Sequence, residues 1–261
     1  MKRNIKITAW VIAAIIVLLV GIVGVISLND NLREILNPPF EETAIFPDDS
    51  RENPADTIFS VNGIEMKMIG VRGGKINCKG FKETIELKDF YIGETEVTQE
   101  LWVAIMGNNP SVHTDNILCP VENVDLQDCA EFVHKLDSVS GGGFYIQSYP
   151  EWLYVAHLGS RNADTSYCDA NASWHKENSD GITHLVKQKT PNALGVYDIV
   201  GNVSEWTVSG SDPLFFVVGG SYETEKGNCK IDAHEVYHAN TKMKSTGLRL
   251  VWYPESPLQY E

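Results

Sequence analysis

Positive charge is scarce in this sequence, in which 21 Lys and Arg residues stand against 35 Asp and Glu residues, for a formal net charge of −14. Nucleic acids and anionic membrane surfaces would repel such a chain, so neither is expected as its main partner. Internal repeats and low-complexity tracts are also missing, so nothing indicates a repeat architecture. With 261 residues, 43% of them hydrophobic, the chain can bury the core of one large domain or two small ones.

Cysteine patterns typical of metal sites are absent as well. None of the five cysteines forms a CxxC pair, and their odd number leaves at least one thiol free or paired between chains if the others pair. Their spacing is equally compatible with five buried thiols, so both interpretations stay open. Four histidines lack the paired spacing with a third ligand that would indicate zinc: His175, His184, His234 and His238.

One long hydrophobic run lies near the N-terminus. Residues 8–28 are 21 consecutive residues without charge, enough at about 1.5 Å per residue to cross a hydrocarbon layer of about 30 Å as a helix. Basic residues precede this run and acidic residues follow it, so the positive-inside rule predicts a cytoplasmic N-terminus. An uncleaved signal anchor is the favoured interpretation, a cleaved signal peptide is the alternative, and no cysteine follows the run to serve as a lipoprotein anchor.

Composition changes after the apolar run predict five segments. Residues 29–56 are acidic, contain several prolines and have few large apolar side chains, which is typical of a stalk. The predicted organisation is a cytoplasmic tail at 1–7, a transmembrane signal anchor at 8–28, the stalk at 29–56, a folded domain at 57–253 and a C-terminal tail at 254–261.

The folded segment combines strand and helix patterns. Short alternating runs such as IFSVNGIEMKMIGV and TIELKDFYIGETEVT predict strands. A helix is expected between Thr98 as N-cap and Gly107 as stop. DLQDCAEFVHKLDSV predicts a second, amphipathic helix with Cys129 on its apolar face, and YPEWLYVAHLGS predicts a third. Cys129 is therefore expected in the core.

Regular patterns fade in the second half of the domain. Residues 162–193 are polar and rich in Asn, Asp, Ser and Gly, and an irregular segment of this length usually carries function or is held by a ligand. VYDIVGNVSEWTV, LFFVVGGSY and GLRLVWYP then predict short strands and tight turns. Helices early and strands with long loops late indicate a mixed α+β domain.

The order of several segments resembles the formylglycine-generating enzyme (sulfatase-modifying factor) family. The matching stretches run from Phe59 to Trp252 and end with NALGVYDIVGNVSEW, GGSY and GLRL in that order. The resemblance implies an α+β fold that is a variant of the C-type lectin-like fold, preceded here by one transmembrane helix. The family is functionally mixed, so membership alone does not define an activity.

The same resemblance implies where cysteine oxidation would occur. Active members carry two cysteines after GGSY that bind copper and activate oxygen, beside a serine that corresponds to Ser221. The first cysteine position is Thr224 here and the second is Cys229. A cuprous site needs two soft sulfur donors, so copper is not expected. The replacement of the first cysteine by Thr224 favours a protein that is not an enzyme, although the question stays open. Buried, structural use of Cys229 is favoured, and a catalytic pair of Cys229 and Ser221 is the alternative.

Calcium is the cofactor that the resemblance implies most directly. Family members hold calcium in the GNVSEW turn, so its ligands here would be the carbonyls of Val200, Gly201 and Val203 and the carboxylate of Glu205. The alternative is a tight turn in which Glu205 pairs with a basic residue such as Arg249.

A second calcium loop of the family has only a partial match. The four candidate ligands are Asn171, Ala172, Asp180 and Ile182, and these types are also common turn residues. Glu94 and Glu96 stand two apart on an expected strand and would therefore share a face, either solvated or paired.

The leading prediction is a membrane-anchored protein with its domain on the extracytoplasmic, periplasmic side. The domain would not oxidise cysteine but would serve binding or envelope assembly, with the irregular loops recognising a protein or glycan. Two alternatives stay open. One is a divergent oxidase that relies on Cys229, and the other is a subunit of a secretion or motility complex.

Overall fold

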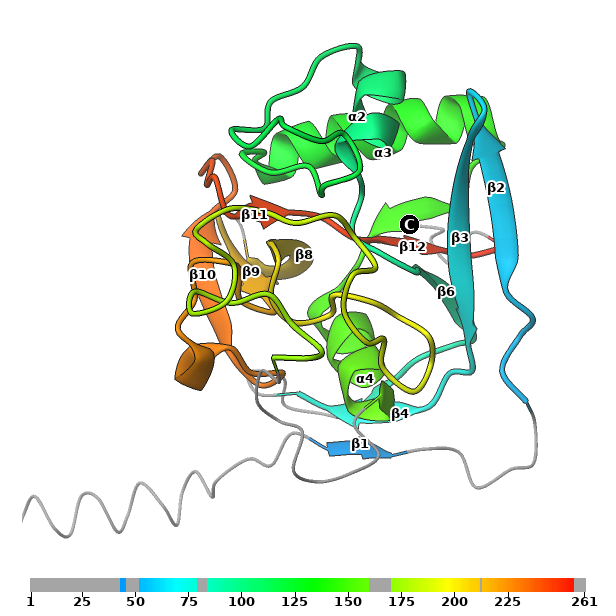
Figure 1. The fold of residues 1–261 in the computed structure, drawn as a ribbon. Coiled ribbons are helices and arrows are strands. Elements are labelled where there is room, and N and C mark those ends of the chain that lie inside the picture. Colours follow the sequence, from blue (N-terminus) through cyan, green and yellow to red (C-terminus); the bar gives the residue numbers. More distant parts are fainter. Residues whose placement is uncertain (1–42, 46–51, 79–83, 160–169, 212, 256–261) are drawn as a thin grey trace, which may run out of the picture. The chain divides into compact units, whose positions relative to one another are not determined.

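The computed structural model describes residues 43–45, 52–78, 84–159, 170–211 and 213–255, which belong to the unit formed by residues 42–261 (Figure 1). Its elements in chain order are β1 Thr43–Ile45, β2 Thr57–Val61, β3 Ile64–Val71, β4 Lys75–Asn77, β5 Ile85–Glu86, β6 Phe90–Gly93, α2 Gln99–Met106, α3 Leu126–Ser140, β7 Phe144–Ile146, α4 Tyr149–Gly159, β8 Ser204–Ser211, β9 Leu214–Val218, the 3-10 helix η1 Lys226–Asn228, β10 His234–His238, β11 Thr246–Gly247 and β12 Leu250–Trp252. This α+β content agrees with the predicted class.

The largest sheet has five strands in the order β2-β3-β6-β12-β7, all paired antiparallel. Its first hairpin turns at Asn62 and Gly63, whose φ angles of 52° and 83° are those of a turn that matches strand twist. Strand β12, near the C-terminal end of the described chain, lies between β6 and β7. The sheet therefore joins segments that are far apart in the sequence.

A second sheet of four strands has the order β10-β9-β8-β11. Strands β8, β9 and β10 pair antiparallel, whereas β11 pairs with β8 in parallel. The β8–β9 register shifts between Trp206 and Gly210, as in a β-bulge. A third, small sheet has the order β1-β4-β5. Because β1 falls within residues 29–56, part of the predicted stalk belongs to the folded unit. The sequence did not predict this strand, because three residues between prolines are too short a pattern to recognise.

The helices begin and end where the sequence predicts. Thr98 caps α2 by accepting a hydrogen bond from the Leu101 backbone N–H, and Gly107 ends it at a φ of 78°. Asp125 and Asp128 form a reciprocal capping box at the start of α3. Helices α2 and α3 lie side by side (Figure 1), and α3 packs on β7 and β2.

Two clusters of buried side chains form the core. One includes Tyr149 and Trp152 of α4, both completely buried. In the other, Trp102 of α2 stacks on Phe132 of α3 with ring centroids 4.9 Å apart and an interplanar angle of 2°. Cys129 is also completely buried there, which confirms the prediction that it is a core residue.

The segment from residue 170 to residue 203 contains no helix or strand, as the composition predicts for its part up to residue 193. The strand expected in VYDIVGNVSEWTV begins only at Ser204. Asn202 holds the segment in place from a buried position. Its backbone N–H donates to the Trp174 carbonyl, and its side chain accepts from the His184 N–H and donates to the His184 carbonyl. These bonds fix the irregular loops against the start of β8.

No helix in the described part of the chain is long and apolar enough to cross a membrane. The predicted anchor at residues 8–28 lies outside the described residues, so the anchor stays a prediction.

Candidate functional site

The hairpin after β9 is the first candidate site, because it contains Ser221 and the two positions that follow it in the family pattern. Gly219 and Gly220 have positive φ angles of 85° and 66°, which only glycine adopts without strain. Thr224 Oγ1 accepts a hydrogen bond from the Ser221 N–H at 2.9 Å, and the Thr224 N–H donates to the Ser221 carbonyl at 2.9 Å. The threonine hydroxyl therefore stabilises a closed turn.

Cys229 lies at the end of this hairpin and is completely buried. Its sulfur is in a disulfide, and it lies 3.7 Å from the Gly219 carbonyl oxygen. The three other described cysteines, Cys78, Cys119 and Cys129, are not in disulfides. A disulfide sulfur is not a free thiolate, so Thr224 and Cys229 as arranged do not fit a copper(I) centre.

Replacing Thr224 with valine is expected to lower the free energy of unfolding by about 1–2 kcal/mol, because the buried Ser221 N–H loses its acceptor. Chemical denaturation measures this change. The Thr224→Ser variant keeps the hydroxyl and should lose less than half as much. Equal losses in the two variants would show that the threonine methyl group, and not the hydrogen bond, stabilises the turn.

The predicted calcium turn places Glu205 in a different environment from a calcium ligand. Its Oε1 accepts from Arg249 Nε at 2.9 Å and forms an ion pair with Nη2 at 2.7 Å, while Oε2 accepts from Gln147 Nε2 at 2.5 Å. Both oxygens are engaged by N–H donors, and a guanidinium repels a divalent cation. This geometry matches the ion-pair alternative with Arg249, and calcium at the carbonyls of Val200, Gly201 and Val203 stays a prediction.

Arg249 is the cation of a larger buried cluster. The remaining N–H groups donate to carbonyl oxygens of Gly93, Tyr197 and Asp198 at 3.0, 2.9 and 3.2 Å. Burial alone would lower the pKa of Arg249, but the neighbouring carboxyl groups, Glu205 first, raise it. Arg249 is completely buried, so its charge depends on these partners.

Two further carboxyl groups face this arginine. Glu96 and Asp198 are 1% and 2% exposed, and Glu96 Oε2 and Asp198 Oδ1 have no hydrogen-bond partner within the described ranges. Burial raises the pKa of Glu96 well above its ordinary value, assisted by the charge of Asp198, and burial also raises the pKa of Asp198. One guanidinium cannot compensate the negative charges of Glu96, Asp198 and Glu205 together, and this imbalance favours the protonated form of Glu96.

The second predicted calcium loop is on the surface. Asn171, Ala172, Asp180 and Ile182 are all exposed, and Asp180 has a φ of 54°, as expected of a turn residue. Within the described part of the chain, no group of three or more His, Cys, Asp or Glu side chains is arranged to hold a metal ion. This second site stays a prediction.

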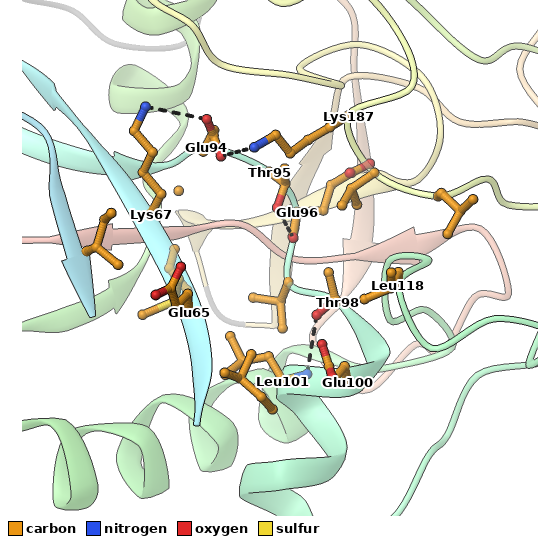
Figure 2. A pocket seen from close by; sticks show the side chains of 18 of the residues that line it. Glu65, Lys67, Glu94, Thr95, Glu96, Thr98, Glu100, Leu101, Leu118 and Lys187 are labelled. Atoms are coloured by element: carbon orange, nitrogen blue, oxygen red, sulfur yellow. Dashed lines mark hydrogen bonds and ion pairs between the residues drawn. The ribbon is translucent and has the colours of Figure 1, made fainter. Parts of the chain in front are cut away.

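A cavity of about 600 Å³ opens between β3, the turn after β6, the start of α2 and the loop at 185–188 (Figure 2). Its charged lining includes Glu94, which pairs with Lys187 at 2.6 Å and with Lys67 at 3.5 Å. Figure 2 shows these three side chains at one end of the cavity and Glu65 and Glu100 at the other. Cavities of about 300–1,000 Å³ are typical of ligand sites.

The sequence did not predict this cavity, and it placed Glu94 and Glu96 on one face of a strand, either solvated or paired. Strand β6 ends at Gly93, so both glutamates lie in an irregular turn and not on one face of a strand. Glu94 is partly exposed and paired with lysines, whereas Glu96 is buried beside the arginine cluster. One feature of the sequence indicated the buried charge cluster. Arg249 is a charged residue within the apolar stretch GLRLVW, and a charged residue in such a stretch indicates a buried ion pair.

The α+β fold, the GGSY hairpin and the GNVSEW turn together define a formylglycine-generating-enzyme-like domain. Residues 53–254 match the family described as sulfatase-modifying factor enzyme 1-like domain, and the chain belongs to this family.

One curated relative is chaperone protein LppX of Paenibacillus barcinonensis, which is 26% identical over 48% of this chain and 63% of its own length. The chain thus spans less than two thirds of that relative.

Solved structures agree on the fold. Treponema denticola variable protein 1 is 26% identical with a TM-score of 0.68, covering 77% of this chain and 100% of that one. PvdO from Pseudomonas aeruginosa is 18% identical with a TM-score of 0.64, covering 78% of this chain and 99% of that one. CarF is 21% identical with a TM-score of 0.56, covering 73% and 99%. The last two show a shared fold alone.

Proposed function

We propose that this chain is a membrane-anchored, extracytoplasmic protein whose family domain binds partner proteins and does not oxidise cysteine. The observation that supports this most strongly is the state of the GGSY hairpin. Thr224 closes the turn with its hydroxyl, and Cys229 is buried in a disulfide, so neither supplies a thiolate. A copper site of the family type needs two thiolates.

Three other findings support the location and the role. The apolar run at residues 8–28 follows a basic tail, as in a signal anchor. Disulfides persist in oxidising compartments, and Cys229 is in a disulfide. The Paenibacillus relative carries the name of a chaperone, a kind of protein that binds other proteins, which favours a role in binding or envelope assembly.

Differential alkylation tests the state of Cys229. In the native protein we expect no labelling of Cys229 with iodoacetamide. Denaturation without reductant should expose Cys78, Cys119 and Cys129, which are buried free thiols, but should leave Cys229 unlabelled. Only denaturation with reductant should label it. Mass spectrometry of the peptides reads out each step, and the three free cysteines control for complete denaturation.

A catalytic assay decides between this proposal and the oxidase alternative. The full chain, with and without copper(I), is incubated with a peptide of the CxPxR type and analysed for formylglycine. We expect no conversion and no tight copper binding. Fast, pH-dependent labelling of Cys229 in the native state, together with conversion of the peptide, would overturn the proposal.

A further inference from the structure

We propose that the cavity between β3, α2 and the 185–188 loop binds an extended segment of a partner protein in which an apolar side chain lies beside a lysine or arginine. This inference rests on the proposed binding function and names the site and the chemistry of the partner. The site differs from the GGSY hairpin, because none of the residues that line the cavity belongs to that hairpin.

The floor and walls of the cavity suit an apolar side chain. Nine apolar residues line it, contributed by β2, β3, α2, β12 and three loops: Ile58, Ile64, Met66, Val97, Leu101, Leu118, Leu185, Val186 and Leu250. Burying a large apolar side chain in such a site removes its surface from water, which favours binding. The apolar part of the partner would therefore contribute most of the affinity.

Two of these apolar residues extend the contact surface beyond the cavity. Ile58 of β2 is 60% exposed and Leu118 is 45% exposed, although both are large and hydrophobic. Exposed apolar residues at the rim of a pocket are typical of protein interaction sites, since a small ligand inside the cavity would leave them in water. This favours a protein segment over a free small molecule.

The charges of the lining favour a cationic partner. Glu94 is neutralised by Lys67 and Lys187, and Lys67 also pairs with Asp56 at 2.9 Å. The carboxylates of Glu65 and Glu100, at the other end of the cavity in Figure 2, have no hydrogen-bond or ion-pair partner among the described residues. A lysine or arginine side chain would compensate these two charges.

Lys187, at one end of the cavity, has an unusual backbone conformation that its neighbours hold in place. Of the six described non-glycine residues with positive φ, five are Asn or Asp, and the sixth is Lys187 at 66°. Its backbone N–H donates to Asp198 Oδ2 at 2.9 Å, and its ammonium group binds Glu94. A strained backbone of this kind persists only where the surroundings hold it, and such residues concentrate at binding sites.

A peptide array tests the proposed specificity. Blocked decapeptides place leucine, valine or phenylalanine next to lysine, glutamine or glutamate, and the full-length chain is applied in a mild detergent. We expect retention of the peptides that combine an apolar residue with lysine. Peptides with glutamate in place of lysine should bind at least about tenfold more weakly in solution, as measured by fluorescence anisotropy, and added salt should reduce the difference.

Matched variants test the location. Leu118→Asp should weaken the best peptide at least about tenfold, and Glu65→Gln about threefold. The controls are Val139→Asp, at a residue 59% exposed on α3, and Glu131→Gln, at a side chain 57% exposed on α3, and both should stay within about twofold. All four sites are on the surface, and thermal unfolding confirms that each variant is folded.

Three outcomes would overturn the inference: no peptide retained, equal binding of lysine and glutamate peptides, or equal effects of Leu118→Asp and Val139→Asp. Any of these, without cysteine oxidation, leaves the proposed binding function intact with its site elsewhere. Formation of formylglycine in the catalytic assay would instead contradict the proposed function itself.

Discussion

Replacing Arg249 with methionine is expected to lower the free energy of unfolding by about 3–5 kcal/mol, because removing one partner of a buried ion pair leaves the other charge uncompensated. In a domain of this size each kcal/mol corresponds to roughly 2–4 °C in Tm, so the melting temperature should fall by about 6–20 °C. Thermal unfolding followed by circular dichroism measures the change.

The size of this effect follows from the surroundings of the arginine. Arg249 binds Glu205 through two nitrogens and donates to three backbone carbonyl groups, and neither side chain of the pair is exposed. Methionine fills a similar volume but donates no hydrogen bond. It would leave Glu205 facing the carboxyl groups of Glu96 and Asp198 without a positive charge nearby.

A double-mutant cycle isolates the ion pair from the other contacts. Glu205→Gln alone keeps the shape and should also destabilise the domain. The combined variant Arg249→Met with Glu205→Gln should be less destabilised than the sum of the two single variants by at least about 1 kcal/mol. Additive losses would show that the carbonyl contacts of Arg249, and not its pairing with Glu205, stabilise this part of the fold.

Local features of the fold could be predicted because their causes are local. Thr98 and Gly107 bound α2 through caps formed within one turn, and the apolar face of α3 is visible in its periodicity. The order of strands could not be predicted in this way. Strand β12 lies between β6 and β7, and that arrangement depends on contacts between residues more than one hundred positions apart.

In the candidate site, too, local features could be predicted and features that depend on the tertiary fold could not. The turn of Ser221 and Thr224 follows from neighbouring hydroxyl and N–H groups, and Thr224 could be identified as a departure from the family pattern. The cavity could not be foreseen, because it is lined by β2, β3, β12, α2 and three loops that only the tertiary fold brings together. Glu205 admitted two interpretations in sequence, and its ion pair with Arg249 is visible only in the tertiary structure.

Glu96 gives the second large effect, which depends on pH. Burial raises the pKa of its carboxyl group well above the ordinary value of 4.5, so the folded protein keeps a proton that the unfolded chain releases. Between the unfolded and the folded pKa, the folded state binds more protons than the unfolded state, and stability therefore falls as pH rises. The loss reaches up to about 1.4 kcal/mol per pH unit, and Asp198, whose pKa is also raised by burial, acts in the same direction.

The Glu96→Gln variant should remove the contribution of Glu96. Glutamine keeps an oxygen for the Val203 N–H, which lies 3.4 Å from Glu96 Oε1, but it carries no ionisable group. We expect the variant to match the wild type near pH 4 and to exceed its free energy of unfolding by about 1–3 kcal/mol at pH 7. Urea denaturation across this range measures both slopes, and Glu65→Gln, at an exposed carboxylate, serves as the control. An unchanged slope in Glu96→Gln would mean that Glu96 is ionised in the folded protein, and that Arg249 then balances three negative charges at once.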